Sequence, residues 1–270
     1  PFRFWATPDS KTAWKAMHDL GVDYINTDMP DKASVYLETL GRRVYYNKAK
    51  SDVYTPTYKS DQTEKSVKNV ILLIGDGNGL TQISSSVLAN GGSLTLTQLK
   101  SIGFIKTQSS DDFTTDSAAA GTALATGTKT YNRSIGMAPN GQPLSNITEL
   151  LDKHQFVTGC ITTDKIVGAT PSSFYAHQKD RDDTDGIAKD LLTSKLSLFV
   201  GGGESGFNKA ELERNSFSIL KDVDELAVSK KNKIGLFIAE NDVPSFLQGR
   251  GNILAQATKN GLQFLNAKKK

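Results

Sequence analysis

The sequence predicts an α/β protein built on a doubly wound, mostly parallel sheet flanked by helices, with a small βαβ fragment in front of it. From about residue 68 onward, short apolar runs alternate with segments of helical periodicity, which is the pattern of repeated strand–helix units. Several of these runs are continuously apolar, as expected of strands buried on both faces. The chain has 270 residues, 37% of them hydrophobic and 23% charged, which is enough for a sizeable core.

Residues 1–40 predict the βαβ fragment. Its expected elements are a strand over 2–7, a helix over 11–20 that Gly21 ends, a strand over 22–28, and a short helix over roughly 31–40. A strand, a helix and a strand imply a parallel pair with a right-handed crossover. Because such a pair cannot bury its own sheet, it needs further strands.

The polar residues 41–67 predict a linker with one short strand over 43–47, so that we expect three regions, 1–40, 41–67 and 68–270. The expected strands of the main domain are 70–75, 103–108, 156–162, 196–201, 216–221 and 234–239. Its expected helices are 80–89, 117–125, 147–154, 171–176, 184–192, 223–229 and 252–265.

Charge and composition exclude several classes of partner. The net charge is +3, from 32 basic and 29 acidic residues, which is too balanced to indicate a nucleic acid or a membrane surface. No apolar stretch reaches the length needed to span a membrane. Cys160 is the single cysteine, so the chain forms no internal disulfide, and its apolar neighbours predict a buried, unreactive thiol.

The stretch from Thr115 to Gly127 is the most informative in the chain, because it places Ser117 in the first turn of a helix of small residues. The first N–H groups of a helix have no partner inside it, and the helix dipole adds partial positive charge there. Together they favour a phosphate or another anion. A hydroxyl at that point can attack an anionic substrate once its proton is removed. The alternative is an alanine-rich core helix with Asp116 or Ser117 as an ordinary cap.

A second carboxylate follows an expected buried strand. Asp76 stands among the glycines of Gly75-Asp76-Gly77-Asn78-Gly79, where ligands bind at the carboxyl ends of strands in open α/β sheets. The spacing matches neither a dinucleotide-binding loop nor a phosphate-binding P-loop. The alternative is a tight glycine turn in which the aspartate caps the next helix.

A third segment carries a hydroxyl and an arginine after another expected strand. Thr170 precedes Pro171, a residue favoured at the first position of a helix, so Thr170 could be the helix cap. Arg181 follows eleven positions later, and arginine is suited to bidentate binding of phosphate. The alternative is that Arg181 is an ordinary surface residue.

Taken together, these segments resemble the N-terminal half of alkaline phosphatase. The stretches that carry the resemblance are, in order, NVILLIGDGNG, TDSAAAGTALATGTKTYNRSIGM, TTDKIVGATPSSFYAHQKDR and LFVGGG, within residues 68 to about 265. Before them, FRFWAT and GVDYINTDMP resemble the C-terminal end of a glycerophosphodiester phosphodiesterase barrel over about forty residues. The catalytic positions of that second family have no counterpart here.

The resemblance to alkaline phosphatase implies a role for each of five residues and implies zinc and magnesium as cofactors. Ser117 would be the nucleophile. Asp76 would bridge one zinc and the magnesium, and Thr170 would bind magnesium through its hydroxyl. Asp116 would orient Arg181, which would clamp two phosphate oxygens. These residue types suit phosphoryl transfer, which depends on positioning and charge neutralisation.

Two features depart from the family pattern. Gly168 stands where the family usually has Asp or His in the outer shell of the magnesium site. The family's remaining metal ligands, including its histidines, belong to its C-terminal half, whereas His18, His154 and His177 match no ligand position. A zinc site needs three or four ligands. We therefore expect an incomplete site and little hydrolysis by this chain alone.

The sequence thus predicts a metal-dependent phosphate monoester hydrolase that acts through a phosphoserine intermediate. The expected ligand is a phosphate monoester or inorganic phosphate. The resemblance also implies a periplasmic or secreted protein and either a homodimer or completion of the site by a further C-terminal segment. Two alternatives stay open, a non-catalytic anion-binding or interaction module and a phosphodiesterase of the same superfamily. A sulfatase is disfavoured, because its Cys/Ser-x-Pro-x-Arg pattern is absent.

Overall fold

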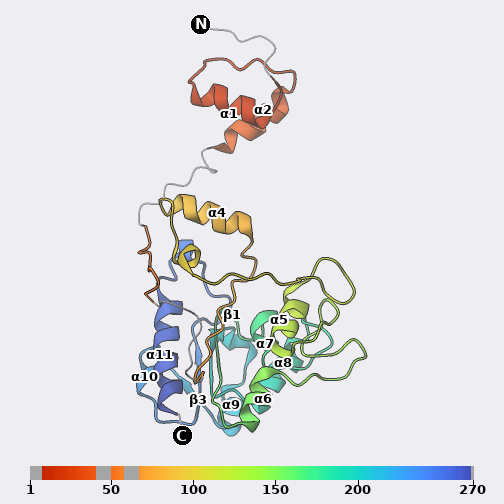
Figure 1. Ribbon diagram of the computed structural model, residues 1–270, viewed down its shortest axis with the longest axis vertical. Coiled ribbons are helices and arrows are strands. Elements are labelled where there is room, and N and C mark those ends of the chain that lie inside the picture. Colours follow the sequence, from red (N-terminus) through yellow and green to blue (C-terminus); the bar gives the residue numbers. More distant parts are fainter. Residues whose placement is uncertain (1–7, 41–49, 58–66, 269–270) are drawn as a thin grey trace. The chain divides into compact units, whose positions relative to one another are not determined.

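The computed structural model describes residues 8–40, 50–57 and 67–268, and the chain divides into two compact units, 1–103 and 104–270 (Figure 1). Each unit is described by itself. The strands expected over 2–7 and 43–47 lie outside the described residues. No helix among the residues described is long and apolar enough to cross a membrane.

Two helices of the first unit form a small packed pair. Helix α1 (Lys11–Asp19) begins where the Ser10 hydroxyl accepts a hydrogen bond from Ala13 N, and α2 (Pro30–Glu38) begins with a proline. Trp14 and Met17 of α1 and Ala33 of α2 are buried against one another. Both helices were expected, but the segment 22–28 between them is not a strand. Its alternating pattern is suited to pairing, yet no described residue pairs with it.

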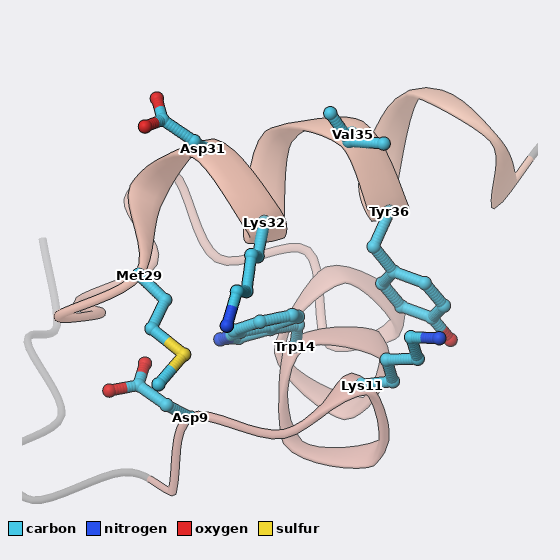
Figure 2. Close-up of a pocket in the computed structure, with 8 residues that line it drawn as sticks. All are labelled: Asp9, Lys11, Trp14, Met29, Asp31, Lys32, Val35 and Tyr36. Atoms are coloured by element: carbon cyan, nitrogen blue, oxygen red, sulfur yellow. The ribbon is translucent and has the colours of Figure 1, made fainter.

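An open hollow of about 610 Å³ lies beside this helix pair (Figure 2). The Lys32 side chain points toward the Trp14 indole, while the Asp31 carboxylate points away from the hollow. Asp9 accepts hydrogen bonds from the Thr27 hydroxyl and, at 3.2 Å, from Asp28 N. These bonds lower the pKa of Asp9, with the Thr27 hydroxyl as the largest cause.

The remainder of the first unit contains α4 (Leu80–Ala89) and the short helix η1 (Thr95–Gln98). The helix over 80–89 was predicted correctly. The strand expected over 70–75 is wrong, because this run is unpaired among the described residues and Leu73 is 82% exposed. An apolar run shows that its side chains favour burial, but a strand also needs a neighbour for its backbone.

A four-stranded parallel sheet forms the centre of the second unit, in the order β1-β2-β4-β3. The strands are β1 (Gly159–Lys165), β2 (Leu198–Gly202), β3 (Phe217–Leu220) and β4 (Lys233–Phe237). Each lies within a few residues of an expected strand. The strand expected over 103–108 is wrong, since this segment pairs with no described strand and Phe104 is 96% exposed.

Helices cover both faces of this sheet, as predicted for a doubly wound fold (Figure 1). The helices are α5 (Ser117–Thr126), α6 (Ile147–Lys153), α7 (Ala169–Ser172), α8 (Thr184–Thr193), α9 (Lys209–Arg214), α10 (Glu225–Val228) and α11 (Ile253–Ala267), with short helices η2 (Glu204–Gly206) and η3 (Phe246–Gln248). Ile187 of α8 and Leu212 of α9 pack on the face that carries Phe199, and Leu226 of α10 and Phe264 of α11 pack on the other.

An aromatic cluster fills the core on one face of the sheet. The rings of Phe217 and Phe237 both meet the ring of Phe199 edge-on, with centroids 5.2 Å away. Gly235 makes room for them, because a Cβ there would lie 2.1 Å from Phe199 Cζ. The three rings belong to β2, β3 and β4, so the cluster packs these strands together on one face of the sheet.

Candidate active site

Ser117 is the first residue of α5, at the positive end of the helix. Asp116 is the N-cap in extended conformation, and its Oδ1 accepts a hydrogen bond from Ala119 N at 2.9 Å. The first turn is therefore held by the aspartate, as an ordinary helix cap would hold it. The serine itself is half-buried.

The second oxygen of the same carboxylate connects the helix to Arg181. Asp116 Oδ2 lies 3.1 Å from Arg181 Nη1 and also accepts a hydrogen bond from Arg133 N at 3.1 Å. The side chains of Asp116 and Arg181 are 24% and 32% exposed, so this ion pair is shielded but reachable from solvent. One carboxylate thus caps the helix of Ser117 and directs an arginine toward it.

Helix α7 carries Thr170 and packs closely against α5. A Cβ on Gly121 would lie 2.6 Å from Ser173 Oγ and 3.6 Å from the Cα of Thr170. The Ser173 hydroxyl donates to Ala169 O at 2.8 Å. The absence of a side chain at position 121 therefore lets the helices of Ser117 and Thr170 approach. Thr170 is the second residue of α7, so the interpretation of it as a helix cap is wrong; the cap is Gly168.

Asp76 belongs to the first unit, in a tight turn before α4. Asn78 N donates to Gly75 O at 3.2 Å, and Gly77 has a φ of +66°. The tight glycine turn was one of the two interpretations of this stretch. The cap of α4 is nevertheless Gly79, without a side-chain hydrogen bond, so Asp76 does not cap the helix.

Position 168 has no room for a side chain, because a neighbouring carboxylate already lies there. A Cβ there would lie 2.0 Å from Asp164 Oδ2, and the other oxygen of Asp164 accepts a hydrogen bond from Lys165 N at 2.7 Å. The carboxylate of Asp164 therefore fills the space next to Gly168.

One of the three histidines is held by hydrogen bonds, and the other two lie at the surface. His177 Nε2 lies 2.9 Å from Leu144 O, and the backbone N–H of His177 donates to Asp190 Oδ2 at 2.8 Å. His154 is the exposed C-cap of α6, and His18 lies next to Asp19 on the exposed side of α1. Among the described residues, no group of three or more His, Cys, Asp and Glu side chains could hold a metal ion. The described residues thus offer single oxygen ligands but no complete zinc site.

Arg133 and Asp180 are part of the site, and sequence reasoning missed them. The Arg133 guanidinium bonds to Asp180, and this bond lowers the pKa of Asp180 to about 2. The sequence carries one signal for this contact, since Arg181 stands between Asp180 and Asp182. Two carboxylates so close to one arginine require a second cation to balance their charge.

The second unit is thus a doubly wound α/β protein with a capped serine helix and an arginine tied to its cap. The family model for alkaline phosphatase matches residues 67–270, and that for the glycerophosphoryl diester phosphodiesterase family matches residues 1–31. The chain belongs to the alkaline phosphatase family. This confirms the resemblance found in the sequence.

Individual relatives agree with this assignment. Alkaline phosphatase 4 of Bacillus subtilis (strain 168) is 35% identical in an alignment of 201 residues that covers 66% of this chain and 43% of that protein. Alkaline phosphatase H of Pseudomonas aeruginosa (strain UCBPP-PA14) is 30% identical in an alignment of 234 residues that covers 69% of this chain and 49% of that protein. The chain thus spans about half the length of these curated relatives.

Solved structures show the same fold. The alkaline phosphatase of the Antarctic bacterium TAB5 superposes with a TM-score of 0.67 and 38% identity, over 71% of this chain and 59% of that one. A mutant of the same enzyme, with a TM-score of 0.66 and 40% identity over 70% of this chain and 57% of that one, has magnesium bound.

Proposed function

We propose that this chain provides the nucleophile and the phosphate-binding arginine of a phosphate monoester hydrolase. The observation that carries the proposal is the carboxylate of Asp116, which caps the helix of Ser117 with one oxygen and holds Arg181 with the other. A serine at a helix N-terminus with an arginine beside it suits a tetrahedral dianion.

In the proposed reaction the Ser117 oxygen forms a bond to phosphorus, and the ester P–O bond breaks. The alcohol leaves with a proton, and the serine carries the phosphoryl group. Water then attacks phosphorus, the serine P–O bond breaks, and inorganic phosphate is released. Arg181 binds two oxygens of the phosphoryl group in both steps, and Asp116 keeps its guanidinium oriented.

Zinc and magnesium are the proposed cofactors. Oxygen ligands of Asp76, Ser117 and Thr170 would each contribute to holding them, and oxygen suits magnesium in particular. Such ions, when bound, neutralise phosphate charge and favour an ionised serine. The described residues supply no full zinc ligand set, so further ligands have to complete it. We propose a further chain segment as their source, in a domain that begins near residue 68.

The test is hydrolysis of p-nitrophenyl phosphate with zinc and magnesium added, together with trapping of a labelled phosphoenzyme by acid. Ser117→Ala should abolish both signals, whereas the exposed Ser205→Ala on η2 should leave both unchanged. Phosphate transfer that persists in S117A would show that the nucleophile is another group. Robust turnover by wild-type chain alone would contradict the incompleteness of the metal site.

A non-catalytic anion-binding module is the second candidate, because the N-terminus of the Ser117 helix and Arg181 can bind an anion without a metal. The two functions differ in their dependence on metal. Phosphate binding that is unchanged by a chelator supports the module, and binding that needs metal supports the hydrolase. Hydrolysis of bis(p-nitrophenyl) phosphate but not of the monoester would indicate the phosphodiesterase instead.

We also propose a location outside the cytoplasm and a homodimer. The support for both is family membership alone. Sedimentation of the purified chain tests the dimer, and fractionation of the native source tests the compartment.

A further inference from the structure

Arg133 holds the two aspartates on either side of Arg181. Its Nε and Nη2 donate to Asp180 at 2.9 and 2.8 Å, which is a bidentate pair, and Nη2 also donates to Asp182. The sequence separation is 47 and 49 residues, so the contact joins two loops rather than neighbours along one helix.

The backbone of Arg133 contacts the same site from another direction. Its N–H donates to Asp116 Oδ2 at 3.1 Å, the oxygen that also binds Arg181. Arg133 has a φ of +74°, a left-handed conformation that is unfavourable for a residue with a Cβ. This conformation directs the N–H toward Asp116 while the side chain turns toward Asp180. The residue thus reaches both the cap of α5 and the loop of Arg181.

The charges explain why a cation is needed there. Asp180 and Asp182 are the immediate neighbours of Arg181 and could compete with Asp116 for its guanidinium. They would also repel a phosphate dianion that approaches Arg181. Arg133 occupies both carboxylates, which leaves Arg181 paired with Asp116.

We propose that Arg133 is a positioning residue, which neutralises Asp180 and Asp182 so that Arg181 stays on Asp116 with its remaining N–H groups available to phosphate. The proposal rests on the proposed function, because it assumes that Arg181 receives the phosphoryl group. It adds a second arginine that acts through the first and does not touch the substrate.

The test uses the full chain, three variants for comparison, and R181K for assignment of the NMR signal. Arg133→Gln removes the charge, and Arg133→Gly also removes it but suits the left-handed backbone, so that a loss of folding does not hide the effect. Arg214→Gln on α9 is the matched control, because its guanidinium Nε donates to Ala210 O within that helix. The readouts are the affinity for inorganic phosphate and the ¹⁵N NMR signal of the Arg181 guanidinium, assigned through its loss in R181K.

In R133Q and R133G we expect phosphate affinity to fall about tenfold, which corresponds to about 1.4 kcal/mol, because Asp180 and Asp182 would then repel the anion. We also expect the Arg181 Nε–H signal to shift and broaden, while R214Q keeps both values. An unchanged Arg181 signal in both variants overturns the proposal, whatever phosphate does. If the wild-type chain binds no phosphate, the proposed function fails, and the Arg181 signal alone still decides whether Arg133 positions it.

Discussion

Replacing Gly121 with alanine should loosen the contact between α5 and α7 and destabilise the protein. The new Cβ would lie 2.6 Å from Ser173 Oγ and 3.0 Å from Ser173 Cβ. Ser173 is completely buried and its hydroxyl donates to Ala169 O, so it cannot turn aside without losing that hydrogen bond. Overpacking costs about 1–3 kcal/mol, and the lost hydrogen bond about 1 kcal/mol.

One term opposes these losses. Alanine is about 1 kcal/mol better than glycine inside a helix. The net change in the free energy of unfolding should therefore be a loss of about 1–3 kcal/mol. At roughly 2–4 °C per kcal/mol for a chain of this size, the midpoint of thermal unfolding should fall measurably.

The assay is urea unfolding, and it compares four proteins, which are the wild type, G121A, S173G and the double variant. Removing the Ser173 side chain makes room for the new methyl group, so the double variant should be more stable than the sum of the two single changes predicts. A G121A protein that is more stable than the wild type by the full helix gain of about 1 kcal/mol would refute the close packing of the two helices.

Three further predictions follow from contacts in the second unit. Asp116→Ala should lower the free energy of unfolding by about 1 kcal/mol through loss of the cap on Ala119, and Asp116→Asn should restore most of it, as urea unfolding would show. The contact with Arg133 lowers the pKa of Asp180 to about 2, so this contact stabilises the folded protein above about pH 4 and the stabilisation is lost as the pH falls toward 2. In R133Q the titration midpoint of the Asp180 carboxyl carbon, followed by ¹³C NMR, should move back toward 3.8. Cys160 is half-buried, and desolvation raises the pKa of its thiol to about 12, so an aromatic disulfide reagent at pH 8 should react with it more slowly in the folded than in the unfolded protein.

Local patterns predicted the helices better than the strands. The helix over 80–89 has its predicted bounds, because spacing and flanking glycines determine a helix within one segment. The runs 70–75 and 103–108 are apolar enough for strands, but a strand is determined by its partner, and none pairs with them among the described residues. Helix α9 (Lys209–Arg214) escaped prediction because it is short and polar, with Leu212 as its single buried residue.

The same distinction applies to the site. Ser117 at the start of a helix, Asp116 before it and Arg181 in the later motif were all visible as motifs in the sequence. Arg133 was not, because its contribution depends on a left-handed backbone and on a contact with Asp180 across 47 residues. Spacing along the chain carries no information on such an approach between loops.

The loop of Arg133 is held in place by its backbone, independently of its charge. Ile135 and Gln178 exchange two hydrogen bonds, each of 2.9 Å, which join this loop to the segment before Arg181. A Cβ on Gly136 would lie 2.2 Å from Ala176 O, so the segments that contain Gly136 and Ala176 are also in close contact. Backbone bonds therefore set where the Arg181 loop lies, and the Arg133 side chain sets the charge around it. Because the two functions are separate, a change of charge at position 133 should alter how Arg181 meets an anion while the loop itself stays in place.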